Sequence, residues 1–198
     1  MELLATLGRT LGFSLAAGVN LYATVAVLGL AARYGWVQLP EQFQVFNHPW
    51  VIGTAAALYV IEFVADKIPW VDSIWDSIHT VIRPVGGAVI AVAALGEASP
   101  TLMAFIALLG GTTAAGSHFT KAGTRVAINT SPEPFTNWFA SLAEDAFVIG
   151  LSLLTLKFPL LALAVSAMIL VGMVWLARRL WNWLRPSGTA QTPPARAS

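Results

Sequence analysis

The 198-residue chain contains no cysteine, and Asp, Glu, Lys and Arg together make up only 11% of it. The lack of cysteine excludes thiol nucleophiles, disulfides and thiolate metal sites. Soluble domains carry about 25% charged residues. A chain this poor in charge, with a mean hydropathy of +0.70, is therefore predicted to be a membrane protein in a lipid bilayer. A net charge of +1 excludes chain-wide electrostatic binding of nucleic acid.

Familiar catalytic signatures are also missing. The sequence has no Gly-x-Ser-x-Gly elbow, no paired-histidine zinc motif and no phosphate-binding glycine loop. We therefore predict no cofactor and favour a protein that is not an enzyme. Metal-assisted chemistry on a phospholipid stays open, because acidic and basic side chains that face each other could support it.

Long uncharged runs are present, and each predicts a transmembrane helix, since a helix needs roughly 20 apolar residues to cross the hydrocarbon. We expect an all-α, polytopic membrane protein with about six transmembrane helices, forming a single transmembrane domain over residues 1–185. The predicted spans are 10–32, 49–68, 78–97, 99–118, 135–156 and 159–184. Residues 186–198 are rich in Ser, Thr, Gln and Pro and are expected to form a disordered cytoplasmic tail.

The basic residues near the span ends predict the orientation. With alternating spans, two of them, Arg33 and Lys157, fall on one side. The others fall on the opposite side: Arg9, Lys67, Arg83, Lys121, Arg125, Arg178, Arg179 and Arg185. By the positive-inside rule, both termini are expected in the cytoplasm.

Two short motifs recur in the same order in the two halves of the chain. The sequence AAGVNL at 16–21 parallels AAGSHF at 114–119, and Lys-Ile-Pro at 67–69 parallels Lys-Phe-Pro at 157–159. Three spans per half would insert the second copy upside down, so 10–97 and 99–185 are predicted to be a 3+3 inverted repeat. Such repeats are typical of transporters with a site at the repeat interface. The alternative is chance similarity, because both motifs are common in membrane helices.

The scarce ionisable residues fall on two stripes, whose spacings of three and four place each stripe on one helix face. The stripes are Asp72, Asp76, His79 and Arg83, then His118, Lys121, Arg125 and Asn129. The second stripe could bind a small anion or a lipid headgroup, or its Lys and Arg could only set topology. Carboxylates four residues apart, such as Asp72 and Asp76, can hold a hard cation or carry protons.

Glu144 and Asp145 lie near the middle of a predicted span, where a charge costs about 2.5–3.5 kcal/mol and needs a cavity or a cationic partner. The candidate partners are Lys121, Arg125 and Arg83. Both a structural ion pair that fastens helices and a proton relay are compatible with this placement. Glu62 lies deeper in its span than Asp66 and is the better candidate for a functional acid, whereas Asp66 and Lys67 fit an ordinary membrane interface.

These residues also carry a resemblance to a known family. The segments that carry it are Phe63–Pro69 (FVADKIP), Val71-Asp72-Ser73, Trp75-Asp76, His79-Thr80, Arg83-Pro84, His118, Lys121–Arg125 (KAGTR), Asn129–Pro134 (NTSPEP) and Glu144-Asp145. The chain resembles, over Leu11–Leu184, the bacterial membrane family catalogued as domain of unknown function 4126. The resemblance implies a multi-pass protein of the bacterial inner membrane and brings no activity, so no functional residue is carried over.

Three hypotheses follow. The first is a small transporter or channel with one buried charged site between the repeats, handling an ion, a proton, a small anion or a lipid. The second is an enzyme or binding module for an anionic lipid headgroup at the cytoplasmic interface. The third is a structural subunit, in which Gly8 and Gly12 allow close contact with another helix or a second copy.

Overall fold

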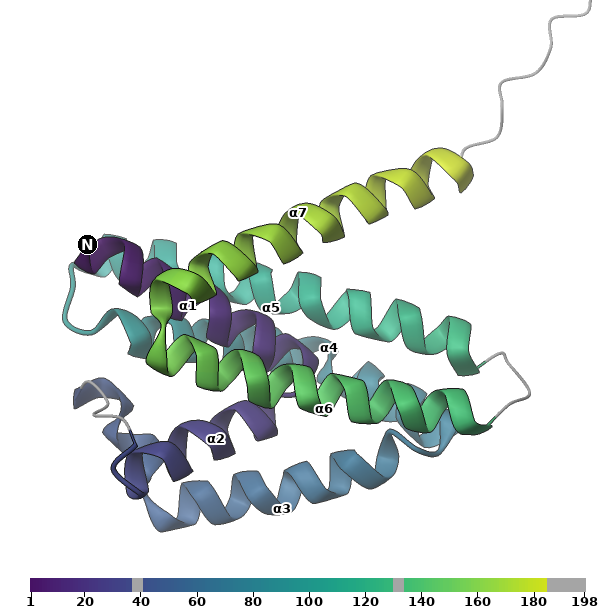
Figure 1. Cartoon of the computed structure of the whole chain (residues 1–198), viewed down its shortest axis with the longest axis horizontal. Coiled ribbons are helices and arrows are strands. Elements are labelled where there is room, and N and C mark those ends of the chain that lie inside the picture. Colours follow the sequence, from purple (N-terminus) through teal and green to yellow (C-terminus); the bar gives the residue numbers. More distant parts are fainter. Residues whose placement is uncertain (37–40, 130–133, 185–198) are drawn as a thin grey trace, which may run out of the picture.

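The computed structural model describes residues 1–36, 41–129 and 134–184 (Figure 1). These residues form seven α-helices and one short 3₁₀ helix, η1, and contain no strand, which confirms the all-α prediction. In chain order they are α1 (Glu2–Val19), α2 (Leu21–Arg33), η1 (Glu41–Asn47), α3 (Pro49–Ala65), α4 (Pro69–Leu95), α5 (Pro100–Asn129), α6 (Pro134–Lys157) and α7 (Pro159–Leu184). The predicted tail over 186–198 lies outside the described residues.

Four of these helices, α4 to α7, are long and apolar enough to cross a membrane. Each begins at a proline, a residue that the first helical position tolerates because its missing N–H has no partner there anyway. Two of the predicted spans are too short. Helix α4 begins at Pro69 rather than at 78, and α5 continues to Asn129 rather than ending at 118. Both polar stripes therefore lie inside long helices.

The first predicted span, 10–32, is not one helix. The chain breaks at Asn20, whose backbone is extended (φ −149°, ψ 101°). The Asn20 side chain caps α2 by accepting a hydrogen bond from the Ala23 N–H at 2.9 Å, and Thr24 Oγ1 donates to the Asn20 carbonyl at 2.8 Å. Asn is among the most favourable N-cap residues, so this cap stabilises a new helix in the middle of an apolar run.

Helices α1 and α2 form a hairpin that enters and leaves at the same end of the bundle (Figure 1). Gly8 packs against the Pro159 carbonyl at the corner between α6 and α7, and Gly29 packs against Phe46 of η1 and Ile52 at the start of α3. The two helices meet inside the bundle at Asn20. Helix α2, with 13 residues, is about 20 Å long, which is too short to cross a hydrocarbon core of about 30 Å.

The amino terminus and the end of α7 lie far apart in the bundle. Met1 lies beside Lys157 and Pro159, at the end of the bundle opposite to the one where α7 finishes (Figure 1). That both termini are cytoplasmic stays a prediction.

Close packing of small residues fixes the centre of the bundle. A Cβ atom on Gly18 of α1 would lie 2.6 Å from Ser117 Cβ and closer still to the Ala114 carbonyl of α5. Ser117 Oγ also donates to the Leu15 carbonyl at 2.8 Å. The two Ala-Ala-Gly motifs therefore cross each other, and the crossing requires glycine at position 18.

This crossing is tested by adding one methyl group. Gly18→Ala forces α1 away from α5 and should destabilise the protein by about 1–3 kcal/mol, the usual cost of overpacking. Gly123→Ala is the matched control, because a Cβ there meets nothing within 4 Å and alanine favours a helix over glycine by about 1 kcal/mol. Thermal unfolding in detergent should show a lower midpoint for Gly18→Ala only; equal midpoints would contradict the crossing.

Single introduced cysteines test the hairpin. Because the chain has no cysteine of its own, no native thiol contributes background labelling. Leu3→Cys and Tyr34→Cys, at the two open ends of the hairpin, should react with a membrane-impermeant maleimide from the same side of sealed vesicles. Asn182→Cys, near the end of α7, should react from the other side. Labelling of Leu3→Cys and Tyr34→Cys from opposite sides would contradict the hairpin.

Candidate functional site

The charged side chains gather in the half of the bundle that the hairpin leaves unfilled. The hairpin tip ends where Gly18 meets Ala114 and Leu21 meets Gly86. Beyond it lie the end of α3, the first half of α4, the second half of α5 and the first half of α6. Most of the predicted site residues are buried there: Glu62, Asp72, Asp76, His79, Arg83, His118, Lys121, Arg125 and Asp145. Asn129 and Glu144 are half-buried.

Arg83 lies at the hairpin tip and is fully buried. Its guanidinium reaches Glu62 Oε1 of α3 at 2.6 Å and Asp76 Oδ1 of its own helix at 3.1 Å. The same side chain donates to His118 Nδ1 of α5 at 2.8 Å and to the Gly18 carbonyl of α1 at 3.5 Å. One cation therefore connects four helices.

The contacts of Arg83 also assign the tautomer of His118. Because arginine only donates hydrogen bonds, His118 Nδ1 accepts, and the ring proton is on Nε2. That proton points to Thr80 Oγ1 at 3.1 Å, and Thr80 Oγ1 donates its own proton to the Asp76 carbonyl at 3.1 Å. The result is a directed chain of hydrogen bonds from Arg83 along the face of α4.

Lys121 and Arg125 of α5 form a second group of ion pairs. Lys121 Nζ lies 3.0 Å from Asp66 Oδ2 and 3.5 Å from both Glu62 Oε1 and Glu144 Oε2. Arg125 binds Glu144 with two hydrogen bonds, Nε to Oε1 at 3.0 Å and Nη2 to Oε2 at 2.6 Å, the strong bidentate geometry. It also donates to the Asp66 carbonyl at 3.1 Å.

The two members of the acidic pair, Glu144 and Asp145, therefore lie in different environments. Glu144 has the cationic partners that its depth predicted, Arg125 and Lys121, whereas Arg83 pairs with Glu62 and Asp76 instead. Asp145, one residue on, makes no ion pair with another described residue and interacts with the Tyr59 hydroxyl of α3 instead. Adjacent helical residues point about 100° apart, so the two carboxylates of a Glu-Asp pair face different neighbours.

The remaining stripe residues lie at the edges of the cluster. Asn129 Nδ2 donates to Asp72 Oδ2 at 2.8 Å. His79 contacts the Trp75 carbonyl at 2.8 Å and the Tyr22 hydroxyl of α2 at 3.0 Å. All eight residues of the two stripes thus lie on the sides of α4 and α5 that face each other or a neighbouring helix.

Sequence reasoning missed Asp66, which was assigned to the membrane interface. Asp66 is only 2% exposed and lies between Lys121 and Arg125. Its spacing of four from Glu62 was the available signal, since that spacing puts both on one face of α3. Lys67 is half-buried and donates to Ser141 Oγ of α6 at 3.2 Å, so it too belongs to the edge of the cluster.

The cluster holds more acids than bases. Six carboxylates, of Glu62, Asp66, Asp72, Asp76, Glu144 and Asp145, face three buried cations, of Arg83, Lys121 and Arg125. Counting Lys67 as a fourth cation still leaves two carboxylates unmatched. In the described part of the chain, Asp72 and Asp145 are the members of this set with no cation within 4 Å. Their partners, Asn129 and Tyr59, are neutral.

Comparison with known families gives one match. The family model described as Domain of unknown function (DUF4126) matches residues 7–179. The chain belongs to this family. A search of curated proteins and a search of solved structures each found no match.

The match to the DUF4126 family covers the hairpin and every residue of the charged cluster, from Glu62 to Asp145. It confirms the resemblance that the motifs indicated. Because the family description assigns no activity, the chemistry of the cluster has to be derived from its geometry.

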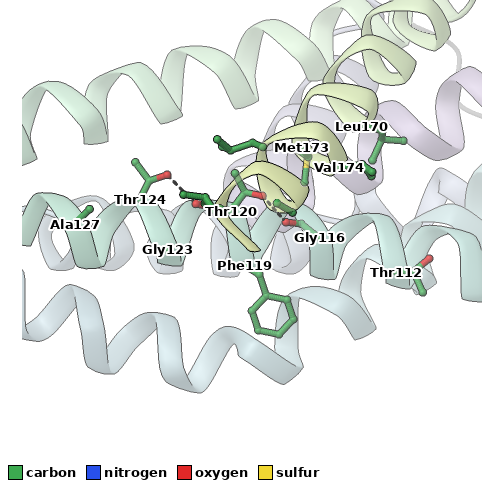
Figure 2. A pocket seen from close by; sticks show the side chains of 13 residues that line it. Thr112, Gly116, Phe119, Thr120, Gly123, Thr124, Ala127, Leu170, Met173 and Val174 are labelled. Carbon is green, nitrogen blue, oxygen red and sulfur yellow. Dashed lines mark hydrogen bonds between the residues drawn. The ribbon is translucent and has the colours of Figure 1, made fainter. Parts of the chain in front are cut away.

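Two cavities lie along α5. The larger, about 730 Å³, lies between α5 and the diverging α7 and contains no charged residue. Its threonine hydroxyls donate to their own helix, Thr120 to the Gly116 carbonyl and Thr124 to the Thr120 carbonyl, both at 2.8 Å (Figure 2). The smaller, about 270 Å³, lies between α4 and α5 and is lined by Asp72, Asp76 and Arg125. The smaller cavity is the one that reaches the cluster.

The ion pairs of Arg125 predict a large stability effect. Arg125→Met leaves Glu144 and Asp66 without a main partner, and losing one member of a buried pair costs about 3–5 kcal/mol. Arg179→Met is the matched control, because exposed Arg179 contacts the Trp175 ring at 5.3 Å, a contact worth about 0.5–1 kcal/mol. Unfolding in detergent should separate the two variants clearly. Equal losses would contradict the burial of Arg125.

Proposed function

We propose that the protein is a membrane transporter or channel in which the charged cluster beyond the hairpin tip is the path of a positively charged species. The observation that carries the proposal is the unmatched negative charge. A purely structural ion-pair network needs equal numbers of acids and bases, because an unpaired charge inside a protein is strongly destabilising. Six carboxylates against three or four cations are stable inside the bundle only when they take up protons or cations. Ionisable residues within membranes commonly mark such paths.

The broken helix supports the same proposal. Helix breaks at transporter sites direct free backbone groups and helix dipoles at the substrate site. Here the carboxyl end of α1 brings the Gly18 carbonyl to Arg83, at the boundary between the hairpin and the charged cluster. A movement of the hairpin tip would therefore change the partners of Arg83 directly.

The proposed inverted repeat would give the same site a place between two related halves. The pair α1 and α2, followed by α3 and α4, would correspond to α5, α6 and α7. The Lys-x-Pro motif precedes α4 in the first half and α7 in the second, and the two Ala-Ala-Gly motifs cross at Gly18 and Ala114. Equivalent segments that meet at one point are the expected result of a two-fold relation between the halves.

The other two hypotheses have less support. A site for an anionic lipid headgroup needs open cations, but Arg83, Lys121 and Arg125 are at most 5% exposed and bind carboxylates. The structural-subunit hypothesis requires Gly8 and Gly12 to be available for contact with a partner. Both instead pack inside the chain, against Pro159 and Thr155.

The arrangement of the helices also suggests how the protein is oriented in the membrane. Arg178 and Arg179 lie at the end of the bundle where α7 finishes (Figure 1), and the positive-inside rule places such residues in the cytoplasm. We infer a cytoplasmic carboxyl terminus in the cell membrane, with the open ends of the hairpin facing the opposite side.

Glu62 is the acid whose replacement tests the path, because it contacts both Arg83 and Lys121. Purified protein in liposomes should move protons or small cations down an imposed gradient, and Glu62→Gln should reduce that flux at least about tenfold, the effect of losing about 1.4 kcal/mol of stabilisation in the path. Glu97→Gln is the matched control, since Glu97 is exposed in the turn between α4 and α5. Unfolding measurements check that both variants are folded. The proposal fails if the wild type moves no cation, or if Glu62→Gln matches Glu97→Gln.

A further inference from the structure

The cleft of about 270 Å³ between α4 and α5 is lined by several side chains that carry oxygen atoms. Its polar lining on α4 consists of Asp72, Ser73, Asp76, Ser77 and Thr80. Successive members are one or three residues apart, so all lie on neighbouring faces of one helix. A water molecule occupies about 30 Å³ in the liquid, so the cleft has room for a partly hydrated ion.

The hydroxyl groups in the cleft have already donated their protons. Ser73 Oγ donates to the Pro69 carbonyl at 3.0 Å, Ser77 Oγ to the Ser73 carbonyl at 2.8 Å and Thr80 Oγ1 to the Asp76 carbonyl at 3.1 Å. A hydroxyl has a single proton, so the two serine oxygens now present only lone pairs, and Thr80 Oγ1, which also accepts from His118 Nε2, keeps one free lone pair. Lone pairs bind a cation and repel an anion.

The two carboxylates of the cleft have oxygens without a hydrogen-bond partner in the described residues. These are Asp72 Oδ1 and Asp76 Oδ2, on side chains that are 0% and 5% exposed. Buried polar atoms in native proteins nearly always have a partner, and a missing one points to an ion or water. Asp72 and Asp76 line the same cleft as Ser73, Ser77 and Thr80.

Arg125, which also lines the cleft, does not compete for these oxygens. Its nitrogen atoms donate to Glu144, Asp66 and Asn137. The single positive group in the cleft lining is thus directed to the other side of α5, towards α3 and α6.

We propose that this cleft binds a monovalent alkali cation such as Na⁺ through Asp72, Asp76 and the hydroxyl oxygens of Ser73, Ser77 and Thr80. Hard cations prefer such oxygen ligands. The local charge favours a single positive charge, because Asp76 is already paired with Arg83 and only Asp72 lacks a cation. In addition, no group of three or more His, Asp or Glu in the described ranges is arranged to hold a metal ion. The inference rests on the proposed function, since this would be the ion that the path takes up.

Binding is tested separately from transport, on purified wild-type protein in detergent. Thermal unfolding is followed during titration with NaCl, with N-methylglucamine chloride as the ionic-strength control. The midpoint should rise with Na⁺ and saturate. Asp72→Asn should weaken half-saturation at least about tenfold, or 1.4 kcal/mol, because it removes a carboxylate ligand of the ion.

Two hydroxyl variants sharpen the test. Ser77→Ala removes one ligand oxygen from an exposed position and should weaken Na⁺ binding about threefold, consistent with a weak neutral oxygen ligand. Thr120→Val is the control, because Thr120 has the same hydrogen bond to its own helix but lines the other cavity. Thr120→Val should bind Na⁺ like the wild type.

Three results would overturn the site: no stabilisation by NaCl beyond N-methylglucamine chloride, a larger effect of CaCl₂ at equal ionic strength, or unchanged binding in Asp72→Asn. If any of these is found while liposomes still show a flux that depends on Glu62, the site is wrong and the proposed function stands. If Na⁺ binds as described but liposomes show no cation flux, the site stands and the transport function is wrong.

Discussion

The charge of Arg83 must be neutralised inside the bundle, because the side chain is fully buried and a charge among apolar helices is strongly unfavourable without partners. Its partners come from α1, α3, α4 and α5. These four helices can therefore pack only in an arrangement that brings Gly18, Glu62, Asp76 and His118 to one point. The neighbouring pairs of Lys121 and Arg125 extend this requirement to α6 through Glu144.

The hairpin and the charged cluster occupy complementary halves of the bundle. The hairpin fills one half of the bundle with small and apolar side chains, and it ends at Asn20. The other half, without such a hairpin, is filled by ionisable side chains that bind one another. This division explains why a chain with only 11% charged residues places so many of them in the interior. It also places the charges next to the helix break at Asn20, where Arg83 donates to the Gly18 carbonyl.

Much of this could be predicted from the sequence. The spacing of the two stripes placed each on one helix face, and the depth of Glu144 required a cation, which Arg125 and Lys121 provide. The break at Asn20 could not be predicted, because the residues on both sides are apolar and one asparagine hardly changes the hydropathy. The lengths of α4 and α5 could not be predicted either, because their charged residues interrupt the hydropathy pattern, although most of these residues are neutralised or hydrogen-bonded by another helix.

The central claim is that the buried cluster has more negative than positive groups and makes up the difference with protons or cations. Infrared difference spectroscopy of the purified protein measures this directly, because a protonated carboxyl group has its own carbonyl band. We predict such a band at neutral pH in Na⁺-free buffer, reduced in both Asp72→Asn and Asp145→Asn, and reduced in the wild type when Na⁺ is added. A spectrum without protonated carboxyl groups, and without any change on adding Na⁺, would contradict the account.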